Sequence, residues 1–158
     1  MKIPESPYPV ILRCTVGSTV HGLNVQDGLE DRDEMAVCVE DMQAAMGVAA
    51  PFEQYVYRTA SVRAGKHDAK SKAGDLDLVV YSLRKYLRLA LKGNPTVLTL
   101  LFAPPIYSNA RGSQLQELAP YIVSREAGKA FLGYLVAQKQ RLLGERGQKD
   151  VNRPELVE

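Results

Sequence analysis

The sequence predicts an α+β fold, in which packed helices cover a short, mixed and twisted sheet and the C-terminal half is helical. Three observations predict it: short β-rich runs come early, apolar residues later recur at helical spacing, and 46% of the 158 residues are apolar. Strands interleaved with helices and followed by a helical stretch are typical of this class. We expect a core over residues 1–110 and a helical portion, packed on that core, over residues 111–158.

Four segments have the composition of strands. The first covers residues 10–16 and stops at Gly17, and the second covers residues 31–39, where apolar residues alternate with others. The third is β-rich over residues 52–62, and the fourth is the compact apolar run over residues 76–81. Between them we expect a helical turn over 18–23, a short helix over 42–46 capped by Asp41, and loops over 24–29 and 63–74.

The later segments have helical signals. Leucines at helical spacing over residues 82–92 predict a helix that ends at Gly93. Asn94 is then a good N-cap, and Pro95 at the first helical position opens a helix over residues 96–102. Two prolines close that helix, and two further helices are expected over residues 113–118 and 124–144.

The net charge of +2 results from segments of opposite sign. Residues 27–41 hold seven acidic side chains against one basic side chain. Residues 58–72 hold five basic side chains against one acidic, and residues 125–149 hold six against two. An acidic segment flanked by basic ones suits a divalent cation bound among polyanionic ligands, although charged loops are often only solvated.

The sequence lacks the motifs that are typical of several protein classes. The N-terminus has an acid and two prolines where a signal peptide needs an apolar run, and no apolar stretch approaches about 20 residues, so we expect a cytoplasmic protein that does not enter a membrane. Cys14 and Cys38 form no CxxC pair and are interpreted as reduced, partly buried thiols. Walker, HExxH and nucleophile-elbow motifs are absent, and Ser18 has no partner set for a hydrolase triad.

The candidate chemistry centres on Asp31 and Asp33. Residues i and i+2 of a strand face the same side, so both carboxylates would project together, with Arg32 opposite. Two like charges held this close are costly unless a cation neutralises them, and Mg²⁺ prefers carboxylate oxygens while it shares phosphate oxygens with a substrate. The competing interpretation is a charged strand end at the surface.

The order of these features resembles the nucleotidyltransferase superfamily typified by DNA polymerase β. That order is a strand, Gly17-Ser18, a short helical segment, a loop, and a strand with Asp31-Arg32-Asp33. More closely, the chain resembles the RNA-ligase-associated branch of predicted nucleotidyltransferases found in bacteria and phages. Four segments carry this resemblance: residues 17–23, residues 31–33, residues 77–95, which are the most specific, and Gly133-Tyr134 with Gln138.

The resemblance implies a nucleotidyltransferase fold and an enzyme that moves a nucleotidyl group from a nucleoside triphosphate to a hydroxyl acceptor. Residues 1–110 would be its catalytic core. The association of the branch with RNA ligases suggests an RNA or tRNA end as the acceptor. Gly17 and Ser18 match the turn whose helix N-terminus holds the triphosphate. His21 in the same segment and Lys85 in the helix over 82–92 are further candidates for nucleotide binding.

The resemblance also implies metal ligands. Asp31, Asp33 and a third carboxylate would bind two Mg²⁺ or Mn²⁺ ions. The third carboxylate would be Asp77, at the start of the strand over 76–81, and Asp75 is the alternative because it shares the face of Asp77 by period 2.

The sequence departs from the pattern of the branch at three places. Glu30 stands where a small polar residue is usual, Glu34 stands where apolar residues are common, and the chain ends at Glu158, where members usually continue with helical sequence. The two glutamates would retune the metal affinity or indicate a site drifting from catalysis. The chain end would indicate a shortened protein or a truncated product, which bears on substrate binding more than on the metal site. The alternative is therefore a non-catalytic nucleotide- or RNA-binding module, and a purely structural interaction domain ranks third.

Overall fold

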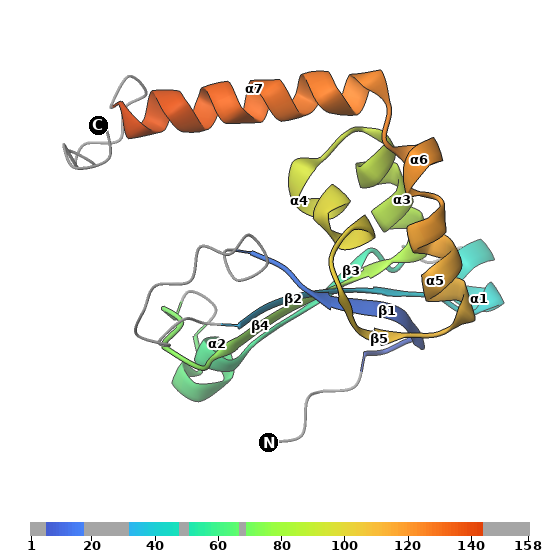
Figure 1. The fold of residues 1–158 in the computed structure, drawn as a ribbon. Helices are drawn as coiled ribbons and strands as arrows, with labels where there is room; N and C mark the ends of the chain where they lie inside the picture. Colours follow the sequence, from blue (N-terminus) through green and yellow to red (C-terminus); the bar gives the residue numbers. More distant parts are fainter. Residues whose placement is uncertain (1–5, 18–31, 48–50, 67–68, 144–158) are drawn as a thin grey trace.

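The structure, a computed structural model, describes residues 6–17, 32–47, 51–66 and 69–143. Over these ranges it is α+β, with a mixed five-stranded sheet and seven α-helices, which confirms the predicted class (Figure 1). The sheet has the order β3-β4-β2-β1-β5; β2 and β4 are parallel, and the other neighbours are antiparallel. The strands are β1 (Val10–Thr15), β2 (Arg32–Cys38), β3 (Gln54–Arg58), β4 (Leu76–Ser82) and β5 (Pro105–Ser108).

Side-chain caps mark the starts of several helices. Asp41 accepts a hydrogen bond from the backbone N–H of Ala44 (2.7 Å). Ser82 and Asn94 act in the same way at the helices that begin at Leu83 and Pro95, where the prediction placed a start. The helices are α1 (Met42–Met46), α2 (Thr59–Ala64), α3 (Leu83–Leu91), α4 (Pro95–Leu98) with the 3₁₀ turn η2 (Thr99–Leu101), α5 (Ala110–Glu117), α6 (Ala119–Ile122) and α7 (Arg125–Leu142).

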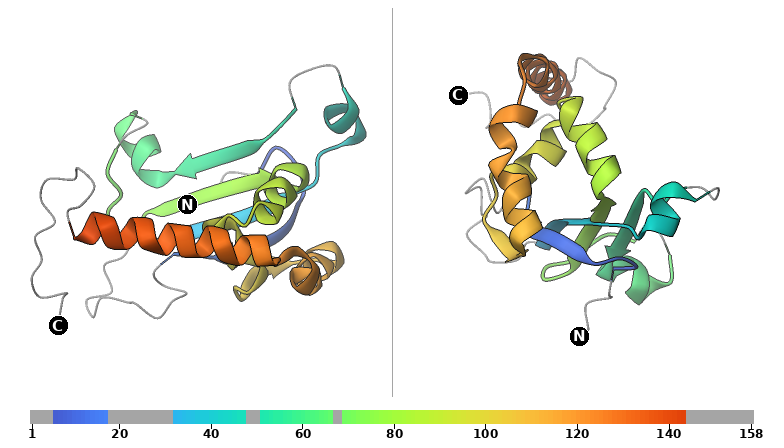
Figure 2. Two further views of the ribbon diagram at one scale, coloured as in Figure 1. Left: turned by 90° about the horizontal axis from the view of Figure 1, so that it is seen from above. Right: turned by 90° about the vertical axis from the view of Figure 1, so that its right-hand side faces the viewer.

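Side chains alternate between the two faces of the sheet along each strand, and different elements pack on the two faces. Met35 and Val37 of β2 lie in the core beneath α3 to α6, and we call this side the helix face. On the opposite face, Ala36 and Cys38 lie in a smaller cluster with β4 side chains. Figure 2 shows that α3 to α6 gather over one end of the sheet, while α7 runs on above the other end. The end of the helix face where β2 and β4 begin is thus not covered by α3 to α6.

Two strand predictions need correction. The β-rich run over 52–62 is a strand only as far as Arg58, and Thr59 starts α2 because its hydroxyl bonds both the backbone N–H and the carbonyl of Leu76. This tertiary contact overrides the β-propensity of the run. β5 was not predicted, since its Pro105 reads as a helix stop; a proline is tolerated there because β5 is an edge strand that pairs only with β1.

The helix predictions otherwise hold, with three differences. The helix predicted over 96–102 is α4 followed by the 3₁₀ turn η2. α5 begins at Ala110 rather than 113, because the side chain of Asn109 accepts from the N–H groups of Arg111 and Gly112. α6 was not predicted.

Cys14 and Cys38 are buried free thiols, and burial raises the pKa of Cys14 to about 11. In the described part of the chain, no helix is long and apolar enough to cross a bilayer.

Candidate functional site

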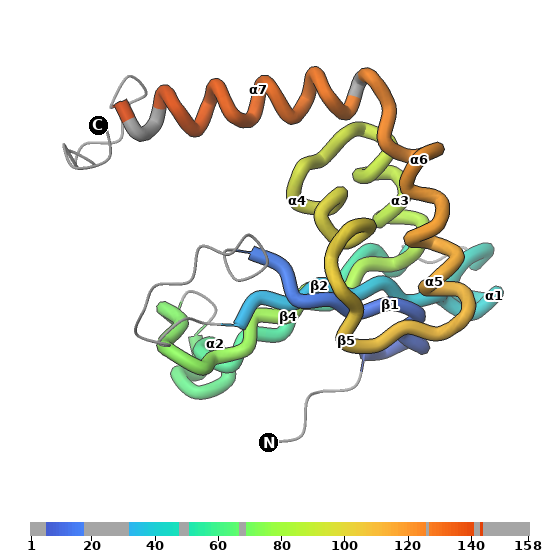
Figure 3. Tube along the Cα trace, viewed as in Figure 1, coloured from blue at the N-terminus to red at the C-terminus, as the bar shows by residue number. Residues whose placement is uncertain are grey.

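Asp33 and Asp77 lie opposite each other on β2 and β4. They are register partners in the parallel pair, whose strands are about 4.8 Å apart, so their side chains project from the same face. That face is the helix face, because Asp33 shares the alternation of Met35 and Val37. Both residues stand near the starts of their strands, which run side by side in the Cα trace (Figure 3). The fold therefore brings together two of the predicted metal-binding carboxylates.

Gly17 lies against the carboxylate of Asp33. The N–H of Val16 donates to the carbonyl of Asp33 (2.9 Å), and this hydrogen bond fixes the C-terminal end of β1 beside β2. Gly17 has φ +84°, and a Cβ atom on it would stand 2.7 Å from Oδ2 of Asp33. Only glycine combines this backbone conformation with such a close approach. The predicted phosphate turn and the predicted metal ligand thus meet at Gly17.

Asp77 is held by two polar side chains that the sequence did not single out for the site. Arg58, its register partner on β3, donates from Nε to Oδ2 of Asp77 (2.9 Å). Ser71 Oγ lies 3.1 and 3.2 Å from the two carboxylate oxygens and accepts from Nη2 of Arg58 (3.3 Å). The Asp77 side chain is 18% exposed. Asp77 is thus partly neutralised yet still reachable from solvent.

Asp75 has a different environment. Arg63 binds both of its carboxylate oxygens (2.6 and 2.8 Å), and the backbone N–H of Lys72 donates to Oδ2 (2.7 Å). The Asp75 side chain is only 5% exposed. The hydrogen bonds from Arg63, reinforced by that from Lys72, lower the pKa of Asp75 to about 2. Asp75 is thus nearly buried in a contact that fixes the loop before β4, whereas Asp77 is more exposed and is the register partner of Asp33, so we assign Asp77, and not Asp75, to the candidate site.

Glu34 does not add its charge to the Asp33 side of β2. Successive strand residues face opposite sides, and the buried Glu34 carboxylate binds Arg13 on one oxygen and Arg32 on the other (2.7 Å for the Arg32 Nε contact). The acid that departs from the family pattern is therefore neutralised by two arginines on the opposite face of the sheet. No local sequence rule reveals the Arg13 partner, because it lies on another strand.

The remaining predicted site residues are not joined to this cluster. Lys85 lies in α3, beyond the far end of β4, and its ammonium group binds Glu53; five strand steps of about 3.3 Å separate Asp77 from Ser82. Ser18, His21 and Asp31 lie outside the described residues, as do the predicted helical turn over 18–23 and the loop over 24–29. Within the described ranges, no three His, Cys, Asp or Glu side chains gather in a way that could hold a metal ion.

Comparison with known families assigns the chain to one of them. A model of the RNA repair pathway DNA polymerase beta family, RlaP, matches residues 3–153. The chain belongs to this family. RlaP membership confirms the resemblance drawn from the four sequence segments and indicates a nucleotidyltransferase. No curated protein sequence matches the chain significantly. The family match includes Gly17, Asp33 and Asp77, the residues that the fold brings together.

Proposed function

We propose that this RlaP protein transfers a nucleotidyl group from a nucleoside triphosphate to a hydroxyl at an RNA or tRNA end. The observation that carries the proposal is the register pairing of Asp33 with Asp77, with Gly17 against the Asp33 carboxylate. The link of the family to RNA repair supports RNA as the acceptor class. In this reaction the acceptor oxygen forms a bond to the α-phosphorus, the bond to the β-phosphate oxygen breaks, and pyrophosphate leaves with the electron pair. The hydroxyl proton is lost to solvent.

The donor set fits a divalent cation. Two carboxylates on adjacent strands repel each other unless positive charge lies between or beside them; Arg58 offsets part of the charge of Asp77, and a cation would offset the rest. Asp33 and Asp77, with Asp31 as predicted from the sequence, would hold Mg²⁺ or Mn²⁺. When bound, the metal would offset the negative charge of the triphosphate and favour ionisation of the acceptor hydroxyl.

The chain's own residues have positioning roles in this proposal. Gly17 lets the Asp33 carboxylate lie against the backbone of the turn, since a side chain here would collide with that carboxylate. Ser71 and Arg58 orient the Asp77 carboxylate from the β3 side. Most of the rate enhancement would come from such placement of charged groups before the reaction.

A transfer assay with two labels tests the proposal. Full-length protein is incubated with single-stranded RNA, Mg²⁺ or Mn²⁺, and a nucleoside triphosphate labelled at the α- or the γ-phosphate. We expect label in the RNA only from the α-position, and none when the terminal hydroxyls of the RNA are blocked. Asp33→Asn should abolish the transfer. Binding of the triphosphate by the wild-type protein without any transfer would instead identify a nucleotide-binding module.

A further inference from the structure

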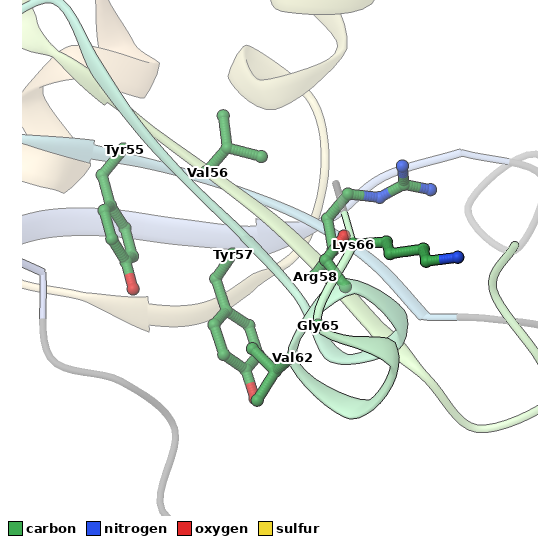
Figure 4. Close-up of a pocket in the computed structure, with 8 residues that line it drawn as sticks. Tyr55, Val56, Tyr57, Arg58, Val62, Gly65 and Lys66 are labelled. Carbon is green, nitrogen blue, oxygen red and sulfur yellow. The ribbon is translucent and has the colours of Figure 1, made fainter. Parts of the chain in front are cut away.

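A pocket of about 450 Å³ lies along the free edge of β3, next to the candidate site. β3 supplies one wall, and α2 with the residues after it closes one end (Figure 4). The volume is in the range of sites for small organic ligands. Arg58 belongs both to this pocket and to the contact with Asp77, so the pocket begins where the candidate site ends.

The pocket combines aromatic rings with cations. Tyr55 and Tyr57, two residues apart on the strand, point to the same side in Figure 4, and both are half-buried. Arg58, the next residue along the strand, points to the opposite side of the sheet, where it contacts Asp77, and the exposed Lys66 lies near it at the α2 end of the pocket. The edge of β3 thus carries rings on one side, packed against the smaller cluster, and cations on the other. Single-stranded nucleic acid needs both, since bases stack on rings and phosphates attract cations.

The backbone of β3 adds polar groups to the pocket. The carbonyl of Glu53 accepts from the N–H of Ser82 (3.0 Å), so this is a hydrogen-bonded position of the antiparallel pair. Such positions alternate, and Tyr55 and Tyr57 therefore direct their backbone groups to β4, while Val56 directs its N–H and carbonyl outward. A donor and an acceptor at an open strand edge suit the edge of a nucleobase.

We propose that this β3-edge pocket binds a nucleotide near the end of the single-stranded RNA acceptor, with Arg58 linking the pocket to the reaction site. The inference rests on the proposed function for the identity of the acceptor. A peptide strand added to β3 would use the Val56 backbone, but it would leave the cations without a role and would meet α2 at one end. Residues 58–72 also hold three lysines, Lys66, Lys70 and Lys72, in addition to the two arginines that pair with Asp77 and Asp75, and these lysines favour a polyanion.

RNA binding without turnover tests the pocket directly. The anisotropy of a labelled single-stranded oligoribonucleotide is measured with the full-length protein in a chelator, without nucleoside triphosphate. Tyr55→Leu keeps an apolar side chain but removes the ring, and should weaken binding about tenfold. Lys66→Gln should lower the slope of log affinity against log salt by about one. Arg111→Gln, an exposed charge at the opposite end of the sheet, is the matched control and should change neither value.

The outcomes separate the pocket from the proposed function. Unchanged RNA binding in both Tyr55→Leu and Lys66→Gln, an equal loss in Arg111→Gln, or no RNA binding by the wild-type protein would overturn the inference. If the pocket variants also transferred nucleotide to RNA like the wild type, the function would stand without the pocket. Pocket-dependent RNA binding without transfer would overturn the function and leave the pocket. A photoreactive nucleotide at the RNA end should crosslink to the peptide that contains Tyr55 and Tyr57.

Discussion

Asp33 and Asp77 face each other across β2 and β4, which form the one parallel pair in the described sheet. This relationship decides which carboxylates can act together. Asp75 is only two residues from Asp77, yet it is bound by Arg63 on both oxygens and fixes the loop before β4. We therefore expect replacement of Asp77 to reduce activity and replacement of Asp75 to reduce stability.

Replacing Gly17 should disturb Asp33. Gly17→Ala places a Cβ atom 2.7 Å from Oδ2 of Asp33, so the carboxylate must move. We expect nucleotidyl transfer to fall about 100-fold, since small displacements of a positioned group have effects of this size. Positive φ also costs alanine about 1 kcal/mol of folding stability. Transfer rates and melting temperatures of the purified variant would be measured together.

Gly74→Ala is the matched control for Gly17→Ala. Gly74 has a similar φ of +78°, but a Cβ atom on it would meet nothing within 4 Å. This variant should lose a similar amount of stability and retain transfer. Equal losses of transfer in the two variants would show that the approach of Gly17 to Asp33 does not matter.

Asp75 should make stability depend on pH in the acid range. Its pKa is about 2 in the folded protein, held there first by Arg63, whereas an unfolded chain has a value near 4. Between about pH 4 and pH 2 the unfolded state binds the proton more readily, so falling pH removes the stability that Asp75 contributes above pH 4. Urea unfolding of Asp75→Asn should show lower stability at neutral pH and a weaker decline across this window. An unaltered decline would refute this role.

Arg58 should compete with a divalent cation for Asp77. The guanidinium donates to Oδ2 of Asp77, and a positive charge this close repels a metal ion more than its hydrogen bond helps to orient the ligand. We expect Arg58→Gln to bind Mn²⁺ several-fold more tightly in the absence of nucleotide, as measured by calorimetry. Arg88→Gln, which removes an equal charge that binds Glu53, should leave the affinity unchanged. Weaker binding in Arg58→Gln would mean that Arg58 mainly positions the carboxylate.

Local patterns explain most of the successful sequence predictions. The caps at Asp41, Ser82 and Asn94 and the alternation in β2 are decided by neighbours in sequence, and each element starts where these signals place it, to within a residue. The end of β3 was missed because it depends on the contact of Thr59 with Leu76. β5 was likewise not predicted, because it forms by pairing with β1, which lies far from it in the sequence.

The candidate site also combines residues that local patterns predict with contacts that only the folded chain reveals. Gly17, Asp33 and Asp77 could be named from motifs, but Asp75 had to stay as the alternative to Asp77, because both share one strand periodicity. The register of β2 with β4, and the partners Arg58 and Arg63, separate them. Lys85 fitted the motif, yet the length of β4 carries it away from the carboxylates. The division into residues 1–110 and 111–158 stays a prediction.

Transfer of an α-labelled nucleotide to RNA by Asp77→Asn and Asp75→Asn, measured side by side, tests the central claim most directly. Each variant removes one carboxylate charge, and a melting temperature shows whether the protein is folded during the assay. The account predicts that Asp77→Asn loses transfer by at least about 100-fold with a melting temperature near that of the wild type. Asp75→Asn should melt at a lower temperature but retain transfer where it is folded. Full transfer by Asp77→Asn, or its loss in folded Asp75→Asn, would contradict the account.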